Sequence, residues 1–180
     1  MYDLMYFDIE TYSPLKSGPT LNDKIITISY AVNNEKPKIL KEWEISEKGV
    51  IENFFNLIKS MDRPILVGHN IFRFDIPVLV SRAHHHGMGS VWELYTLFVR
   101  NYCIDTIQCL LPSNNLYFRG LNLSRCADRL GIINNTCPGD SICEEYTQGN
   151  YNQIIEHNIT DVEITRTLYQ KIRAANFIPF

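Results

Sequence analysis

Residues 4–11 read Leu-Met-Tyr-Phe-Asp-Ile-Glu-Thr, and the rest of the chain is best interpreted outward from them. The apolar and aromatic run predicts a buried strand. Successive side chains on a strand point to opposite faces, so Asp8 and Glu10 point the same way. Like charges side by side repel unless a positive group lies between them, and hard cations such as Mg²⁺ or Mn²⁺ bind carboxylate oxygens. The pattern predicts a two-carboxylate metal platform; the alternative is an ordinary strand end with two solvated acids.

The composition is that of an ordinary globular protein. The chain has 180 residues, 45% hydrophobic and 21% charged, which predicts one domain, residues 1–180, with a core of its own. The formal net charge of −3 excludes the strongly basic proteins that coat nucleic acid, but it does not exclude a local nucleic-acid site. No apolar run approaches a membrane span and no signal peptide is evident, so we expect a soluble, cytoplasmic protein without a membrane partner.

The cysteines do not indicate a metal site. Five of them lie in the second half of the chain, and no two form a C-x-x-C pair, so we expect no zinc knuckle. A disulfide between Cys137 and Cys143 and unpaired thiols both stay open from the sequence alone.

The local patterns predict an alternation of strands and helices. Alternating or β-branched runs predict further strands at residues 24–33, 38–45, 64–68 and 101–106. Helical periodicity predicts helices at residues 46–58, 76–83, 90–99, 107–111, 121–130 and 150–175. Polar, Gly- and Pro-containing stretches predict loops at residues 12–22, 114–120 and 134–141. The second of these loops mixes aromatics with Arg, which favours stacking on unpaired bases or, equally, a partly buried loop anchor.

Three further residues could carry chemistry. Asp75 follows a buried strand and begins a helix, where it is either a functional acid or a capping acid. His157 and Asp161 are four residues apart and therefore share one face of the last predicted helix; the alternative is a surface pair. The triplet at residues 84–86 is expected to be a solvated helix end, because adjacent helical residues cannot all bind one ion.

Together these acids match the needs of two-metal phosphodiester chemistry. Asp8, Glu10, Asp75 and Asp161 come from separate predicted elements, as a pair of cations roughly 3.5–4 Å apart would require. Such a reaction also needs a base near the attacking water.

The order of these motifs resembles the DEDD superfamily of 3′–5′ exonucleases, and within it the proofreading exonuclease domain of family B DNA polymerases. The matching segments are residues 6–11 (Tyr-Phe-Asp-Ile-Glu-Thr), 67–79 (Val-Gly-His-Asn-Ile-Phe-Arg-Phe-Asp-Ile-Pro-Val-Leu) and 158–165 (Asn-Ile-Thr-Asp-Val-Glu-Ile-Thr). In order and approximate spacing they cover nearly the whole chain. The resemblance implies an α/β, RNase H-like fold with a central five-stranded mixed sheet flanked by helices, its first three strands antiparallel to one another.

The resemblance also implies roles for the acids. Asp8, Glu10 and Asp161 would hold the catalytic ion. Asp8 would also bind a second ion, with Asp75 assisting mainly through water, so that two divalent ions, Mg²⁺ or Mn²⁺, are the expected cofactors.

Substrate contacts are implied at three more positions. Thr11 falls where the family contacts the 3′-terminal nucleotide. Asn70 matches a motif residue that helps to shape the site, and Phe74 matches an aromatic that packs near the terminal nucleotides.

One position departs from the family pattern. The family B type carries Tyr four residues before the last acid, where this chain has His157. The other branch uses His five residues before it, which is the position of Glu156 here. Because one residue turns a helix by ~100°, His157 either orients the attacking water or is imperfectly placed, and Glu156 is a second candidate base.

The expected function is a metal-dependent 3′–5′ exonuclease acting on single-stranded or frayed DNA ends. An RNA-trimming enzyme and a catalytically weak nucleic-acid-binding module are the alternatives. The chain is too short to include a polymerase, so a stand-alone module or a partner acting in trans in replication or repair is expected. Basic residues expected to contact the strand are Lys16, Arg73, Arg100, Arg119 and Arg125.

Overall fold

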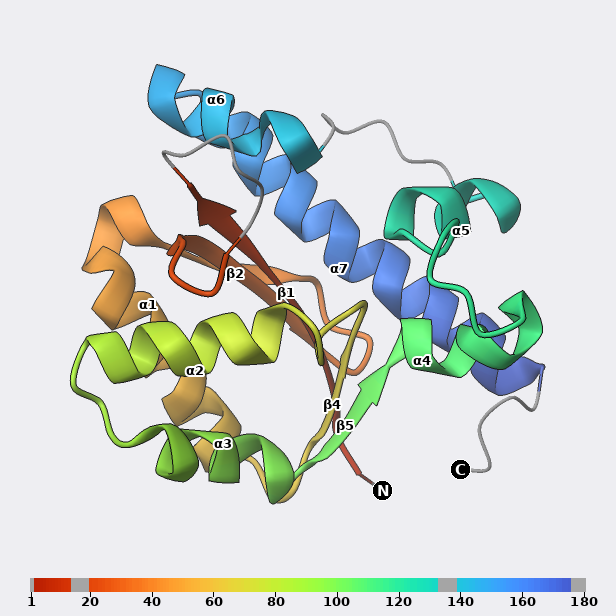
Figure 1. The fold of residues 1–180 in the computed structure, drawn as a ribbon, viewed down its shortest axis with the longest axis horizontal. Coiled ribbons are helices and arrows are strands. Elements are labelled where there is room, and N and C mark those ends of the chain that lie inside the picture. Colours follow the sequence, from red (N-terminus) through yellow and green to blue (C-terminus); the bar gives the residue numbers. More distant parts are fainter. Residues whose placement is uncertain (1, 14–19, 133–138, 176–180) are drawn as a thin grey trace.

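A computed structural model describes residues 2–13, 20–132 and 139–175 of the chain. Its centre is one five-stranded mixed sheet in the order β3-β2-β1-β4-β5 (Figure 1), which confirms the expected α/β fold class. The strands are β1 (Leu4–Tyr12), β2 (Lys24–Val32), β3 (Lys38–Lys41), β4 (Ile65–Gly68) and β5 (Tyr102–Asp105). Strand β2 runs antiparallel to both β1 and β3, whereas β4 runs parallel to β1 and β5 parallel to β4.

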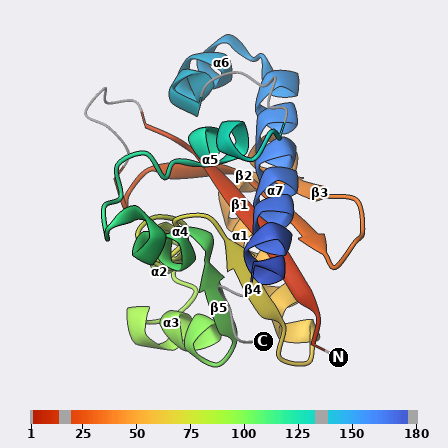
Figure 2. The same cartoon turned by 90° about the vertical axis from the view of Figure 1, so that its right-hand side faces the viewer.

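Helices cover both faces of this sheet (Figures 1 and 2). They are α1 (Glu42–Ser60), α2 (Asp75–His85), α3 (Val91–Val99), α4 (Thr106–Leu110), α5 (Leu123–Arg129), α6 (Ile142–Gln148) and α7 (Tyr151–Ala174), with single 3₁₀ turns at Leu111–Asn114 and Gly139–Ser141. Helices α1, α2 and α3 pack on one face of the sheet. Helix α7 crosses the other face, where α4, α5 and α6 contact α7. In the described part of the chain no helix is both long and apolar enough to cross a bilayer.

The alternation along β1 determines which face carries its acids. Met5, Phe7 and Ile9 are buried in the core shared with α1 and α2. Tyr6 points to the opposite face, where its ring meets that of Tyr169 on α7 with 5.9 Å between centroids. Residues two apart on a strand share a face, so Asp8 and Glu10 are directed towards α7.

The predicted third strand is too long. It ends at Lys41, and residues 42–45 begin α1 instead. Glu42 bonds to Lys24 at 2.7 Å and Trp43 stacks on Tyr151 at 4.2 Å, so tertiary contacts override the local alternation. Ser46, with φ of 67°, kinks α1, and its hydroxyl accepts a bond from the Gly49 amide, so a second helical segment does start where the sequence predicted one.

The second half of the chain differs from the sequence prediction in further places. The predicted helix at 121–130 is shorter, because the Asn122 side chain accepts from the Arg125 amide and caps α5 there. Helix α6 was not predicted. The expected loop at 134–141 falls mostly outside the described residues, as does Cys137, so its pairing with Cys143 is not tested. No disulfide joins any two of the four cysteines that the structure describes.

The histidine triplet is only partly the solvated end that was expected. His84 and His85 are exposed, but His86 lies 2.7 Å from Glu47. The triplet therefore joins α2 to α1 in addition to ending α2.

Candidate functional site

The carboxyl ends of β1 and β4 bring the first three acids together. These strands are parallel, so the segment that leaves β4 arrives beside the end of β1. Asp75, at the start of α2, is 2% exposed, and its Oδ1 accepts a bond of 3.2 Å from the Ile9 amide, which lies between Asp8 and Glu10. Asp75 is therefore a buried acid held against β1, and the N-cap position of α2 is Phe74.

Helix α7 supplies the remaining side chains. Nδ2 of Asn158 donates a bond of 2.7 Å to Oδ2 of Asp8. Nε2 of His157 lies 3.3 Å from Oε1 of Glu10 and 3.5 Å from Oδ2 of Asp161. Glu10, His157 and Asp161 each present an atom able to bind a metal, and these atoms lie within 4.8 Å of one another.

The electrostatics of this cluster are unfavourable for four free carboxylates. Burial, and then the neighbouring acids, raise the pKa of Asp8 and of Glu10 well above their ordinary values. Burial raises the pKa of Asp75 to about 7, although two backbone amides oppose it. Burial also raises the pKa of Asp161, against the lowering effect of His157. Acids in this state require protons or a cation, and carboxylate oxygens suit a hard divalent cation, so the residues present fit the expected ions.

The structure distinguishes the two candidate bases. Glu156 is exposed, whereas His157 is 7% exposed and directed at the carboxylates. A Cβ added to Gly139 would lie 3.5 Å from Nε2 of His157, so the segment before α6 covers this ring. The helical spacing of His157 and Asp161 thus places both in the cluster, as the sequence predicted.

The three expected substrate contacts lie around the same strand ends. Thr11 is half-buried directly after Glu10, where the pairing of β1 with β2 shifts in register. Phe74 is half-buried and immediately precedes α2. Asn70 has a φ of 67°, and its buried Oδ1 has no hydrogen-bond partner among the described residues. Their contact with a substrate stays a prediction.

Two residues that the sequence interpretation missed organise this region. Asn158 holds Asp8, and its only sequence signal is a polar residue on the buried stripe of a helix, one turn before Asp161. Asp105 is 1% exposed and its carboxylate accepts from the amides of Asn70 (2.8 Å), Phe72 (3.2 Å) and Ile107 (3.0 Å). The sequence pattern placed Asp105 only within the predicted strand at residues 101–106 and gave it no role.

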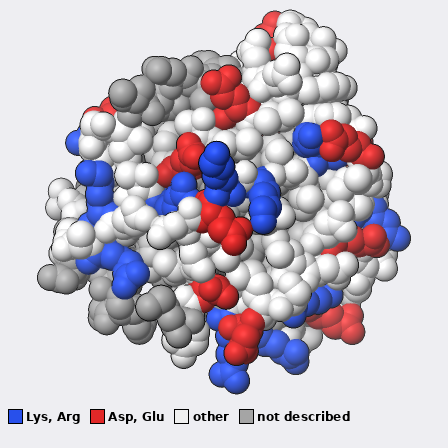
Figure 3. Space-filling model, turned by 180° about the vertical axis from the view of Figure 1, so that it is seen from behind, with Lys and Arg blue, Asp and Glu red and all other residues white. Residues whose placement is uncertain are grey.

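The expected basic residues that the structure describes are exposed. The face in Figure 3 intersperses acidic and basic side chains instead of presenting a single basic field. Arg73 is exposed and its guanidinium lies 4.4 Å from the ring centroid of Phe118. Arg100, Arg119 and Arg125 are exposed, and Lys16 lies outside the described residues.

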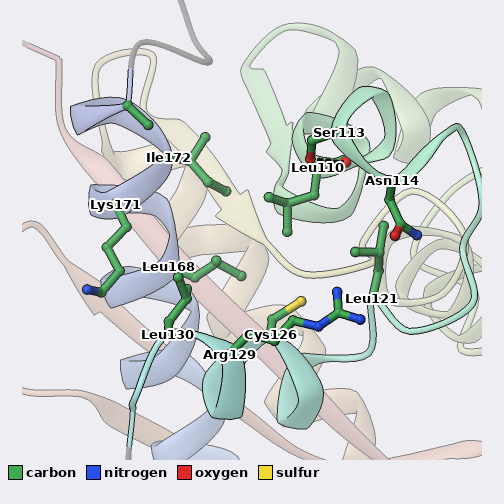
Figure 4. A pocket seen from close by; sticks show the side chains of 11 residues that line it. Leu110, Ser113, Asn114, Leu121, Cys126, Arg129, Leu130, Leu168, Lys171 and Ile172 are labelled. Carbon is green, nitrogen blue, oxygen red and sulfur yellow. Dashed lines mark hydrogen bonds between the residues drawn. The ribbon is translucent and has the colours of Figure 1, made fainter.

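A separate cavity of about 220 Å³ lies between α4, α5 and the end of α7 (Figure 4). Its lining is mainly apolar, with Leu110, Leu130 and Leu168 beside the cationic Arg129 and Lys171. None of the four carboxylates lines it, so it is not part of the acidic site.

Comparisons with known proteins relate this chain to DNA polymerases. The profile of the family described as "DNA polymerase family B, exonuclease domain" matches residues 1–99. DNA polymerase 2 of Aeropyrum pernix is 38% identical over 85 residues, or 47% of this chain and 11% of the relative. A DNA polymerase of Archaeoglobus fulgidus is 38% identical over 80 residues, or 44% of this chain and 10% of the relative.

More distant similarity extends further along the chain. The catalytic polypeptide of DNA polymerase epsilon from Dictyostelium discoideum is 29% identical over 117 residues, or 51% of this chain and 5% of the relative. The family B DNA polymerase of Pyrobaculum calidifontis superposes with a TM-score of 0.76 over 96% of this chain and 24% of that one, at 21% identity, which shows the shared fold. The chain thus spans only about a tenth of the length of these three sequence relatives, or less.

Proposed function

The chain belongs to the exonuclease domain family of family B DNA polymerases, and from this membership we propose that it is a divalent-metal-dependent exonuclease that removes nucleotides from the 3′ end of single-stranded or frayed DNA. The observation that carries the proposal is the convergence of four largely buried carboxylates from β1, α2 and α7 at one edge of the sheet. Nothing in an ordinary fold requires such a convergence, and their mutual repulsion makes it costly without cations.

The proposed roles are those that the family resemblance implies. Asp8, Glu10 and Asp161 would hold one ion, and Asp8 with the aid of Asp75 a second, either Mg²⁺ or Mn²⁺. Bound ions of this kind supply an activated water and neutralise charge on the phosphate and the leaving oxygen. Asn158 keeps Oδ2 of Asp8 in place, and the Ile9 amide does the same for Asp75.

His157 is the proposed base. Its Nε2 lies in the space between Glu10 and Asp161, where an imidazole can accept a proton from the attacking water or orient that water. Thr11, Asn70 and Phe74 are the proposed contacts of the terminal nucleotides.

DNA is the favoured substrate because the relatives are DNA polymerases by name. A polymerase partner in replication or repair is part of the proposal for the same reason. RNA trimming and binding without cleavage are the other outcomes that an experiment has to distinguish.

The test is the shortening of 5′-labelled single-stranded DNA, and of the RNA of the same sequence, in Mg²⁺, Mn²⁺ or EDTA. Wild type is compared with Asp8→Asn, and with Asp62→Asn as a matched control, since Asp62 is an exposed acid just before β4. We expect a metal-dependent ladder on DNA that persists in Asp62→Asn and is lost in Asp8→Asn. Faster shortening of RNA would reassign the substrate, and no shortening of either polymer by a folded protein would leave a binding module.

A further inference from the structure

Two loops present unusually exposed aromatic side chains. In residues 69–74, between β4 and α2, Phe72 is 46% exposed. In residues 115–122, between the turn after α4 and the start of α5, Tyr117 and Phe118 are 69% and 41% exposed. Exposure of this extent makes these aromatics poor loop anchors. The sequence interpretation of residues 114–120 as a partly buried anchor is therefore disfavoured, and base stacking is favoured.

The two loops are fixed to one another. His69 lies in the first loop, and its Nε2 is 2.7 Å from the Leu121 carbonyl of the second, while its Nδ1 is 2.7 Å from Oγ1 of Thr106. The guanidinium of Arg73 then lies over the ring of Phe118 at 4.4 Å. Both loops can be followed in Figure 2, beside α4 and α2.

The second loop also contains a residue in an unfavourable backbone conformation. Asn115 and Leu116 have φ values of 52° and 63°; Asn adopts this left-handed region readily at the end of a helical turn, whereas Leu rarely does. The side-chain amide of Asn114 donates to the carbonyls of Tyr117 and Arg119, which holds this shape. Leu116 is 70% exposed, so burial does not compensate for the strain. Strain kept in this way is typical of ligand-binding loops.

We propose that Phe72, Arg73 and Phe118 form a stacking platform for unpaired bases of the strand whose 3′ end lies among the carboxylates. The proposal rests on the proposed function, and Phe72 and Arg73 belong to the loop that leads directly into Asp75 at the start of α2. Bases stack on aromatic rings and on guanidinium planes, and the Arg73–Phe118 pair offers both surfaces already aligned. The exposed Arg119 adds a cation for the phosphates.

Single-stranded nucleic acid is the occupant that this chemistry selects. Phosphate contacts alone require cations but no exposed rings, and a duplex hides the faces of its bases. A strand with unstacked bases can use both the rings and the guanidinium of the platform.

The experiment separates base stacking from phosphate binding. In an Asp8→Asn background, which prevents degradation, fluorescence anisotropy measures the affinity for oligothymidylate and for an oligomer of the same length whose sugars carry no bases. Phe118→Ala is added to this background, with Phe118→Trp as the conservative variant. Trp92→Ala, at a residue 82% exposed on α3 and in neither loop, is the matched control.

We expect Phe118→Ala to weaken oligothymidylate binding about tenfold and to leave binding of the baseless oligomer unchanged. Phe118→Trp and Trp92→Ala should keep the parent affinities. An equal loss for both oligomers, or no loss for either, would overturn the platform. If the wild-type chain shortens strands in the cleavage assay but Phe118→Ala shows no base-dependent loss of affinity, the platform alone is refuted. If the wild-type chain shortens no strand, the proposed function is refuted.

Discussion

Nδ2 of Asn158 donates a 2.7 Å hydrogen bond to Oδ2 of Asp8, joining the last helix to the first strand across 150 residues of sequence. The bond stabilises the ionised form of an acid whose pKa burial and neighbouring carboxylates raise. It also fixes the orientation of the carboxylate that the proposal assigns to both ions. The acidic site therefore depends on a residue that is not itself an acid.

Asn158→Ala should weaken Mn²⁺ binding by about tenfold, because residues that orient metal ligands typically contribute 10–100-fold in affinity. Isothermal titration at neutral pH measures the effect. Asn152→Ala, at an exposed position on the same helix, should bind Mn²⁺ as wild type does. If Asn158→Ala binds Mn²⁺ with wild-type affinity, Asn158 does not position a metal ligand.

Asp75→Asn should stabilise the metal-free protein, and more so at high pH. The pKa of Asp75 is about 7 in the folded chain against an ordinary 3.8, so between these values the folded state binds a proton that the unfolded state has lost. Its contribution to stability therefore falls as pH rises from about 4 to about 7. Asn keeps an oxygen for the Ile9 amide and removes the charge.

We expect Asp75→Asn in EDTA at pH 8 to raise Tm by about 2–8 °C, because a gain of ~1–2 kcal/mol corresponds to ~2–4 °C per kcal/mol at this chain length. The difference should shrink towards pH 4, and Asp62→Asn should show none. Thermal scans of both variants across this pH range provide the measurement. A Tm lower than wild type at pH 8 would contradict the assigned pKa of Asp75.

His157→Phe should slow cleavage of single-stranded DNA at least about tenfold, because proton transfer by a positioned side chain typically contributes 10²–10⁴-fold. His157→Tyr, which restores the family's residue at this position, should keep more activity than His157→Phe. Strand affinity, measured with Asp8→Asn present in each protein, should be the same for all three side chains. Equal cleavage rates for wild type and His157→Phe would contradict the assignment of His157 as the base.

Glu47→Ala should destabilise the fold without involving the site. The Glu47 carboxylate is buried and bonds to Arg82 at 2.6 Å and 2.7 Å, to His86 at 2.7 Å and to the Ile25 amide at 2.8 Å. Removing one partner of such a network typically costs about 3–5 kcal/mol. Urea unfolding should show this loss, while Glu52→Ala, at an exposed residue of the same helix, should lose about 0.5 kcal/mol or less.

Which of the acidic side chains share a face could be predicted, because the short repeat of a strand or a helix determines the direction of each side chain. Asp8 and Glu10 share a face through the two-residue repeat of a strand, and His157 and Asp161 through the near four-residue repeat of a helix. Asp75 was assigned to the same site only through the family resemblance, and the structure holds its carboxylate against the Ile9 amide of β1. The five-stranded mixed sheet followed from the family resemblance, and the structure confirms it.

The remaining features depend on contacts between distant segments, which local patterns do not contain. Residues 42–45 alternate as a strand would, but the pairing of Glu42 with Lys24 and of Trp43 with Tyr151 places them in a helix. Asp105 looked like a simple strand end, yet it bonds to three amides in two segments. The Arg73–Phe118 contact joins two loops whose proximity depends on His69 and its bond to the Leu121 carbonyl.

The central claim is that the chain hydrolyses a strand from its 3′ end, and the position of a label tests it most directly. One single-stranded DNA is labelled at the 5′ end in one sample and at the 3′ end in another, and each is followed with Mg²⁺ or Mn²⁺ over time. We expect the 5′-labelled strand to shorten one nucleotide at a time while the 3′ label is released at once as a mononucleotide. The opposite pattern, internal fragments, or intact strands in the presence of folded protein would contradict the claim.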